Sequence, residues 1–303
     1  PTTLRADELG ALITAFTALF DLQPGAEVTC EANPDTVDVA YLEALRAGGV
    51  ERLSIGVQSF DRAVLEALDR VHPASSARRA FAAARRAGFT NVSVDLIYGA
   101  RGETLPSWVR TLDEAIALRP EHLSCYALTV EPNTRLGRSV ATGTLVPPEP
   151  DLQADMYEAA CERLAAAGYR HYEVSNWAFP GFESRHNLGY WEGRAYLGLG
   201  AGAHSFRSDR RWWNVRPPER YLALVEDGRP PLGGGERLTE QEARLEHLLL
   251  ALRRADGLPV EEVPPDVAAS FAERGLSVLE GDRFLPTEPG MLLANEMVLA
   301  LSP

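Results

Sequence analysis

The sequence predicts an α/β fold: a mostly parallel sheet of βα units, closed as a barrel or partial barrel, followed by a small α+β domain. Two observations lead to this prediction. Apolar segments of strand length alternate five times with segments of helical periodicity, at intervals of roughly 25 to 50 residues. Polar residues such as Gln58 and Asp95 lie inside or at the ends of the strand segments, and barrels of this kind hold functional groups at the carboxyl ends of strands.

The predicted strands are short apolar runs that end at turn residues. They cover residues 26–32, 52–58, 91–98, 122–130 and 169–174. The predicted helices have apolar residues three and four positions apart and end near Gly or Pro. They cover residues 4–20, 36–46, 61–68, 75–87, 105–118 and 152–167.

The pattern changes beyond these segments. Residues 179–211 are rich in Gly, aromatic residues and His with little periodicity, which predicts a binding loop. Residues 229–235 (RPPLGGG) have the composition of a linker. A helix is then predicted over 239–254, because Thr239 and the Glu three residues later form a capping box.

A second helix over 263–274 and a hairpin over 277–285 with a Gly-Asp turn complete a small domain that resembles a winged helix. The acidic composition argues against DNA binding by this shape. The predicted division of the chain is a barrel domain over 1–206, a connecting segment over 207–235 and a C-terminal domain over 236–303.

Composition excludes several classes of protein. The chain has 303 residues, 45% of them hydrophobic, and no apolar run approaches the length of a membrane helix, which predicts a soluble globular protein. Its 30 basic residues against 43 acidic ones give a net charge of −13, so duplex nucleic acid is not expected as a partner. All basic residues are Arg, and without Lys the chain cannot form a Schiff base or supply a P-loop lysine.

Three cysteines, Cys30, Cys125 and Cys161, are far apart in sequence and form no CxxC pair. This spacing predicts neither a disulfide framework nor a local zinc knuckle, and it favours a reducing, cytoplasmic setting. The chain starts at Pro1 without a signal segment, and we expect it to be a fragment of a longer protein.

Two carboxylates lie in strand segments. Asp95 in VSVDLIYG shares a face with Ser93, opposite Val94 and Leu96, if the strand alternates. A buried carboxylate is costly unless it is paired or hydrogen-bonded, which favours a functional role for Asp95. Glu31 in CEANP lies near a strand end, where a functional role and a turn-capping role both stay open.

Other candidates carry weaker signals alone. Gln58 fits a turn and Arg70 fits a helix end that interacts with the helix dipole. His186 in SRHNLGYWEG is flanked by aromatic residues in a segment without a period, which suits either a packed loop or a planar aromatic ligand or haem iron. The run 198–203 fits G-x-G-x-x-A without the βαβ unit of dinucleotide binding, which favours close approach of the backbone to a ligand or a tight strand crossing. His204 follows this run directly.

Taken together, the motifs resemble one family. In chain order they are CEANPD, RLSIGVQSF, LDRVH, NVSVDLIYGARGET, LSCYALTVEPNT, YEVSNWA, HNLGYW and GLGAGAHSF. This order strongly resembles the coproporphyrinogen-oxidase-like radical S-adenosylmethionine (SAM) proteins, most closely their haem-chaperone branch. The resemblance covers residues 1 to about 206, and the C-terminal segment is similar to the family's small C-terminal domain.

The resemblance implies a partial (βα)6 barrel, with its first strand absent from this chain, that binds SAM and a [4Fe-4S] cluster at the strand ends. Its SAM-contacting positions, matched residue by residue, are Glu31, Gln58, Arg70 and Asp95, with weaker matches at Thr129 and His204. Carboxylates and an amide suit the ribose hydroxyls and amino group of SAM, and an Arg suits its carboxylate.

HNLGYW separates the haem chaperones from the oxidases of the family. The resemblance implies that His186 binds haem iron, with Tyr190 and Trp191 as porphyrin-stacking partners. The family's CxxxCxxC cluster motif would precede residue 1, and the three cysteines present cannot replace it, so we expect this chain alone not to hold the cluster.

The leading hypothesis is therefore a haem chaperone that passes haem to an acceptor protein, with peripheral contact to a membrane acceptor left open. The alternative is oxygen-independent coproporphyrinogen III dehydrogenase, in which a SAM-derived radical initiates decarboxylation. A third hypothesis, which ignores the resemblance, is a barrel hydrolase that uses Asp95 and Glu31 with a divalent metal. Few histidines lie near the strand ends to support it.

Overall fold

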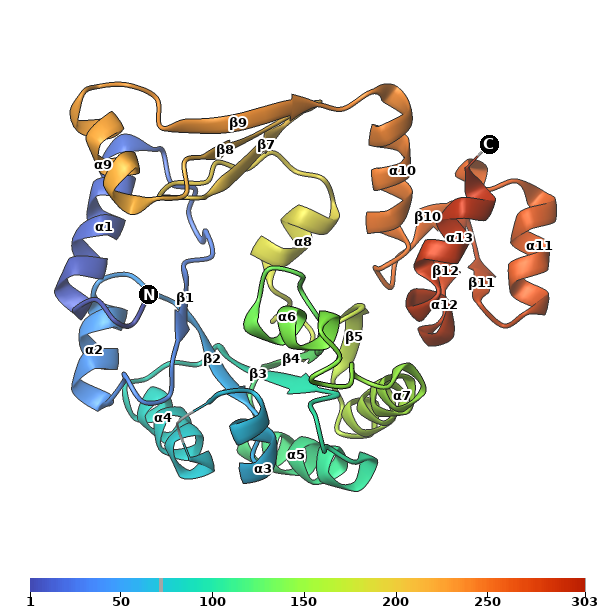
Figure 1. The fold of residues 1–303 in the computed structure, drawn as a ribbon, viewed down its shortest axis with the longest axis horizontal. Coiled ribbons are helices and arrows are strands. Elements are labelled where there is room, and N and C mark those ends of the chain that lie inside the picture. Colours follow the sequence, from blue (N-terminus) through green and yellow to red (C-terminus); the bar gives the residue numbers. More distant parts are fainter. Residues whose placement is uncertain (71–72, 303) are drawn as a thin grey trace. The chain divides into compact units, whose positions relative to one another are not determined.

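The computed structural model describes residues 1–70 and 73–302 and contains two compact units, Pro1–Glu183 and Ser184–Pro303 (Figure 1). The division falls before the boundary predicted after residue 206. Residues before position 206 belong to the second unit because they pair with its strands. Tyr196 pairs with Phe206, and residues 204–207 form a strand that pairs within the second unit. Among the described residues, no helix has both the length and the apolar character needed to cross a membrane.

The first unit is built on one six-stranded sheet of order β1-β2-β3-β4-β6-β5. Its strands are β1 (Thr29–Ala32), β2 (Arg52–Gln58), β3 (Val92–Tyr98), β4 (His122–Ala127), β5 (Arg170–Glu173) and β6 (Asn176–Ala178). The first four pair in parallel, which confirms the predicted parallel sheet of βα units.

Strand β6 was not predicted, and it runs antiparallel to both β4 and β5. The chain reverses within YEVSNWA because the Glu173 carboxylate accepts hydrogen bonds from the Ser175 backbone N–H at 3.0 Å and from the Asn176 side chain. This turn contains neither Gly nor Pro, so the segment reads as the end of a single strand.

Helices connect and cover these strands. They are α1 (Ala6–Leu19), α2 (Val39–Ala47), α3 (Arg62–Ala67), α4 (Ala74–Arg86), α5 (Leu105–Leu118), α6 (Arg135–Ala141) and α7 (Pro150–Ala166). Asp38, Asp61 and Thr104 cap α2, α3 and α5 through side-chain oxygens that accept first-turn N–H groups. All six predicted helices are present; α6 was not predicted.

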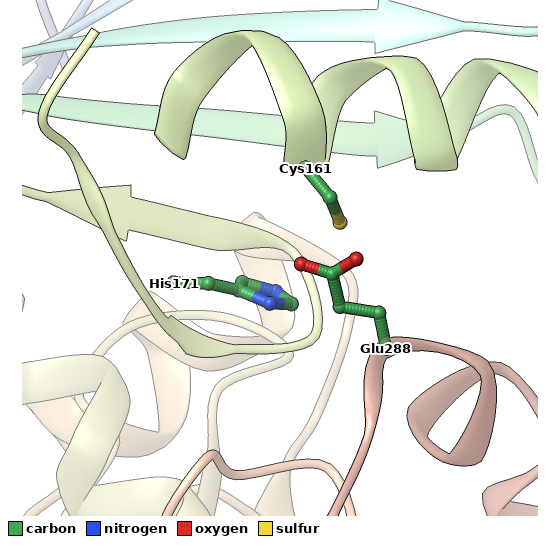
Figure 2. A group of neighbouring side chains, drawn as sticks. All are labelled: Cys161, His171 and Glu288. Atoms are coloured by element: carbon green, nitrogen blue, oxygen red, sulfur yellow. The ribbon is translucent and has the colours of Figure 1, made fainter. Parts of the chain in front are cut away.

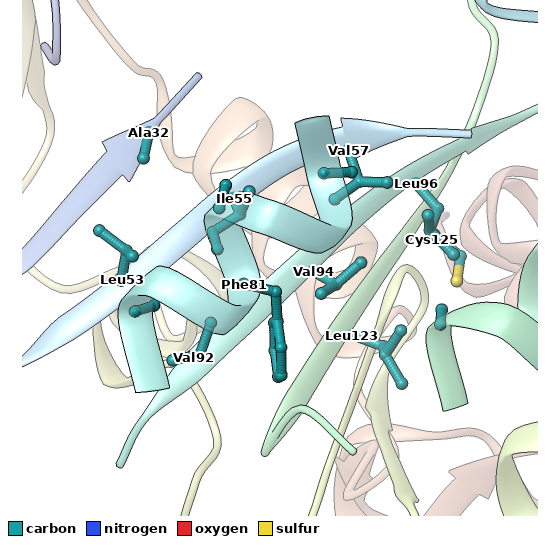
Figure 3. Close-up of a cluster of buried hydrophobic side chains, with 14 of the residues drawn as sticks. Ala32, Leu53, Ile55, Val57, Phe81, Val92, Val94, Leu96, Leu123 and Cys125 are labelled. Atoms are coloured by element: carbon teal, nitrogen blue, oxygen red, sulfur yellow. The ribbon is translucent and has the colours of Figure 1, made fainter. Parts of the chain in front are cut away.

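One face of the sheet forms the apolar core of the first unit (Figure 3). Side chains alternate along each strand, so that residues of β1 to β4 meet helix α4 through Phe81 on this face. The strand residues of this face are Ala32, Leu53, Ile55, Val57, Val92, Val94, Leu96, Leu123 and Cys125. Each fully buried aliphatic side chain contributes about 1.5–3 kcal/mol.

The second unit begins with α8 (Arg185–Trp191) and a three-stranded antiparallel sheet of β7 (His204–Arg207), β8 (Arg210–Asn214) and β9 (Leu232–Arg237). Helices α9 (Pro218–Glu226) and α10 (Glu240–Ala251) follow β8 and β9. The linker predicted over 229–235 is wrong, since most of it is strand β9, which pairs with β8.

The C-terminal part of the second unit has its own core, formed with α10. Its elements are β10 (Leu258–Pro259), the 3₁₀ turn Val260–Glu262, α11 (Pro265–Glu273), β11 (Ser277–Glu280), β12 (Arg283–Pro286), α12 (Glu288–Leu292) and α13 (Ala294–Leu301). The Thr239 capping box is present, and Gly281 turns the predicted hairpin with a φ of 58°. Helices α10 and α11 and the hairpin of β11 and β12 thus follow one another along the chain.

Candidate functional site

The second face of the parallel sheet is polar. The register places Glu31 beside Ser54, Ser54 beside Ser93, and Ser93 beside His122. Asp95 lies two residues after Ser93 and therefore on the same face, as the alternation predicted. Glu31, Ser54, Asp95 and their polar neighbours thus form one row across β1 to β4, on the side of the sheet opposite the apolar core.

Asp95 is held by hydroxyl groups. Ser54 Oγ lies 2.7 Å from Asp95 Oδ2 and 2.8 Å from Oδ1, and Ser93 Oγ donates to Oδ1 at 2.9 Å. Burial raises the pKa of Asp95 above its ordinary value, and the bonds from these serines and Ser124 act in the opposite direction. The carboxylate therefore has the partners that a buried charge needs.

His122 extends this network. Ser93 has one hydroxyl hydrogen and gives it to Asp95, so its oxygen accepts the Nδ1–H of His122 at 2.8 Å. His122 Nε2 then accepts from the Tyr172 hydroxyl at 2.7 Å. Burial holds the pKa of His122 well below its usual range, which keeps the ring neutral. Tyr172, His122, Ser93 and Asp95 thus form a chain with one direction of hydrogen donation.

Gln58 joins the polar row at a strained backbone position. Its φ is 65°, a conformation that costs a non-glycine residue about 1–2 kcal/mol. The strand register shifts at this point, and the Gln58 amide folds back over Gly56, where a Cβ would lie 2.9 Å from Nε2. Gly56 is the strand neighbour of Asp95, so the fold brings the Gln58 amide toward Asp95. Non-glycine residues with strained backbone dihedrals are found more often at functional sites than elsewhere.

The remaining residues matched to SAM-contacting positions in the first unit are exposed and lie outside the hydrogen-bonded network of Asp95. Glu31 is exposed on β1, in register with Ser54. Arg70 is exposed in the turn after α3, where its backbone N–H donates to Leu65. Thr129 is exposed after β4, and its hydroxyl donates to the Ala127 carbonyl at 3.4 Å. The structure therefore brings Glu31, Gln58 and Asp95 to one face and leaves Arg70 and Thr129 in loops.

Three features of this site were not predicted from the sequence: Arg52, Tyr172 and the role of His122. Arg52 opens β2, is 4% exposed, acts electrostatically on Asp95 and His122, and has a buried Nε without a hydrogen-bond partner in the described structure. The signal for Arg52 was a cation at the start of an otherwise apolar strand segment. No comparable signal existed for Tyr172, because its contact with His122 spans 50 residues.

His186, Tyr190 and Trp191 lie on α8, so the prediction of an irregular loop around His186 is wrong. Ser184 caps the helix by accepting the Asn187 N–H at 3.3 Å. A seven-residue helix is too short to show periodicity in the sequence. The rings of His186 and Tyr190, one turn apart, meet edge to face with centroids 4.8 Å apart.

His204 belongs to β7 of the second unit, and its ring stacks on Trp213 with centroids 5.7 Å apart. The glycine run before it makes a tight backbone crossing. A Cβ at Gly198 would lie 2.1 Å from the His204 carbonyl oxygen. Of the two explanations predicted for this run, the contact at Gly198 corresponds to the tight strand crossing.

The three cysteines are buried in the apolar core of the first unit. Burial raises the pKa of Cys30 and Cys125, which disfavours the thiolate form that an iron–sulfur cluster requires. Cys161 on α7 and His171 on β5 lie within 4.8 Å of each other through their ligand atoms (Figure 2). The His171 ring stacks on Trp177 at 4.3 Å, and burial lowers its pKa to about 4, which indicates aromatic packing.

Comparison with known proteins agrees with this architecture. Residues 2–115 match the model of the radical SAM superfamily. The structure is similar to that of coproporphyrinogen III oxidase (HemN) from Escherichia coli, a radical SAM enzyme, with a TM-score of 0.80 and 23% identity over all of this chain and 75% of that one. The parallel sheet thus has the fold of radical SAM proteins.

Relatives named "Heme chaperone HemW" match nearly the whole chain. The protein from Mycobacterium tuberculosis is 40% identical over 99% of this chain and 78% of its own length. The relative from Bacillus subtilis is 34% identical over 98% and 82%, and that from Escherichia coli is 39% identical over 98% and 80%. The chain belongs to the HemW family.

Proposed function

We propose that this protein is a haem chaperone, which binds haem on α8 and transfers it to an acceptor protein. The observation that carries the proposal is the pairing of His186 with Tyr190 on α8, in a chain that belongs to the HemW family. The acceptor and a cytoplasmic location stay predictions.

The geometry of α8 suits haem. A neutral imidazole is a common ligand of haem iron, and the edge-to-face contact with Tyr190 restricts rotation of the His186 ring. Tyr190 and Trp191 follow on the same helix and provide aromatic surface for a porphyrin. Bound haem would supply the iron, His186 would ligate it, and Tyr190 and Trp191 would orient the macrocycle.

Membership of the radical SAM superfamily implies SAM and a [4Fe-4S] cluster. The polar face fits SAM, because Glu31, Asp95 and the Gln58 amide offer acceptors and a donor for ribose hydroxyls and an amino group. We propose these residues, with Arg70 and Thr129 of the same unit, as its contacts, and the match of His204 to a SAM-contacting position stays a prediction from the sequence. The three cysteines pack in the core and do not fit the cluster, so no step of the proposed function uses them as its ligands.

A haem titration followed by Soret absorbance tests the proposal. His186→Ala should weaken haem binding at least tenfold, which corresponds to about 1.4 kcal/mol, and shift the Soret maximum because an iron ligand is lost. Asn187→Ala is the matched control, since residue 187 projects about 100° away around the same helix. Equal affinities and spectra for wild type and His186→Ala would remove His186 from the ligand role.

Neither alternative hypothesis gains from the structure. The similarity to coproporphyrinogen III oxidase lies at 23% identity and supports a shared fold only. A metal-dependent hydrolase would need His122 as a ligand beside Asp95, but both ring nitrogens of His122 are engaged by Ser93 and Tyr172.

A further inference from the structure

The second unit contains a pocket of about 340 Å³ that α8, β7, β8 and α10 line. One wall is aromatic and includes Tyr190, Trp191, Tyr196 and Phe206. Leu250 of α10 lines it with other apolar residues. The volume lies near the lower end of the 300–1,000 Å³ typical of small-molecule sites, so the pocket suits a part of a tetrapyrrole.

The aromatic wall is continuous with the proposed haem ligand. The Tyr190 ring contacts the His186 ring and also meets the Tyr196 ring edge to face, with centroids 4.7 Å apart. Tyr196 pairs through its backbone with Phe206, and their ring centroids are 6.2 Å apart. A flat ligand bound at His186 would therefore extend over Tyr190 toward the pocket.

A cation lies at this wall. Arg211 on β8 is the cross-strand neighbour of Phe206, and its guanidinium carbon lies 5.6 Å from the centre of the Phe206 ring. The Arg211 side chain is 28% exposed and contacts two carboxylates, Glu246 of α10 and Glu236 of β9, the latter at 3.5 Å. Arg211 is thus held at the pocket in a carboxylate-binding arrangement.

We propose that this pocket receives the propionate-bearing edge of haem, and that Arg211 exchanges its contact with Glu246 for a haem propionate. The inference rests on the haem binding proposed above and assigns the orientation of the ligand. A haem propionate replaces the Glu246 carboxylate, so the Arg211 guanidinium has a charged partner both before and after haem binds. Guanidinium groups pair with carboxylates through two parallel hydrogen bonds, which would fix the direction of the macrocycle.

The test compares haem with haem dimethyl ester, which has the same ring and iron but no propionate charge. Arg211→Gln should weaken haem binding about tenfold, leave ester binding unchanged and leave the Soret maximum in place. Arg210→Gln is the matched control, because Arg210 lies on the opposite face of β8, with its guanidinium 5.9 Å from the Trp212 ring. Arg210→Gln should change neither affinity.

Glu246→Gln separates propionate binding from a structural role of the Arg211–Glu246 pair. It removes the carboxylate that competes for Arg211, so haem affinity should rise severalfold while ester affinity stays constant. If the Arg211–Glu246 pair had only a structural role, Arg211→Gln and Glu246→Gln would both bind haem and haem dimethyl ester more weakly. That result would overturn the assignment. If Arg211→Gln bound haem as the wild type does, and binding still depended on His186, propionate binding in this pocket would be contradicted while haem binding at His186 would stand. Absence of haem binding by the wild-type protein would overturn the proposed function and this inference together.

Discussion

Gly234 of β9 lies directly against the indole ring of Trp213 on β8, and a Cβ at position 234 would lie 2.5 Å from Cζ2 of the ring. The two residues are register partners in the antiparallel sheet. A glycine in this strand therefore makes room for the indole of its neighbour. The glycines that suggested a linker are therefore compatible with strand β9 at this position.

Gly234→Ala should destabilise the protein by about 1–3 kcal/mol, because the added methyl group overlaps the indole and the sheet must shift. Urea unfolding followed by tryptophan fluorescence measures the change. Gly189→Ala on α8 is the control, since its nearest neighbour would lie at an ordinary 3.8 Å. Alanine in a helix is favoured by about 0.5–1 kcal/mol, so this control should change stability in the opposite direction.

Ser93→Ala should lower the free energy of unfolding by about 1–3 kcal/mol, because it leaves the His122 Nδ1–H without its acceptor and removes one donor from Asp95. Denaturant unfolding measures this loss. Ser75→Ala, at an exposed serine of α4, should change stability by less than about 0.5 kcal/mol. A loss no larger at position 93 than at position 75 would contradict the hydrogen-bonded chain.

Glu103, in the loop after β3, should make stability depend on pH. It is 4% exposed, and burial raises its pKa from 4.5 to about 7, although its carboxylate accepts the Ala100 N–H at 3.1 Å. Between these pH values the folded state keeps a proton that the unfolded state has lost. The contribution of Glu103 to the free energy of unfolding therefore falls as pH rises from 4.5 to 7.

Glu103→Gln keeps an oxygen for the Ala100 N–H and removes this titration. The stability of the variant relative to wild type should rise with pH and gain on the order of 2 kcal/mol between pH 5 and pH 8. Urea unfolding at both pH values measures the difference. Glu66→Gln, at an exposed carboxylate of α3, should show no such gain. If the stability of Glu103→Gln relative to wild type were also the same at pH 5 and pH 8, the raised pKa of Glu103 would be contradicted.

Features that depend on short stretches of sequence were predictable. The alternation of Asp95 and Ser93 with apolar residues placed Asp95 on the polar face, and the Thr239 capping box located the start of α10. In both cases the physical cause lies within a few residues: strand alternation in the first and a side-chain cap in the second.

Features that depend on distant contacts were not predictable. The hydrogen bond between His122 and Tyr172 joins residues 50 positions apart, and the close packing of Gly234 against Trp213 occurs between two strands of a sheet. Helix α8 starts from one serine cap and spans two turns, so it has too few residues for a periodic signal. For α8 and β9, composition alone therefore predicted a loop and a linker where the chain forms a helix and a strand.

The strained backbone of Gln58 should trade stability for SAM binding. Gln58→Gly relieves the positive φ and should raise the free energy of unfolding by about 1 kcal/mol, while loss of the amide should weaken SAM binding. Urea unfolding and equilibrium dialysis with labelled SAM measure the two effects. Arg119→Gly is the matched control, because Arg119 has a φ of 55° at the exposed end of α5. It should gain similar stability and bind SAM as the wild type does, whereas unchanged SAM binding by Gln58→Gly would show that the strain does not serve this ligand.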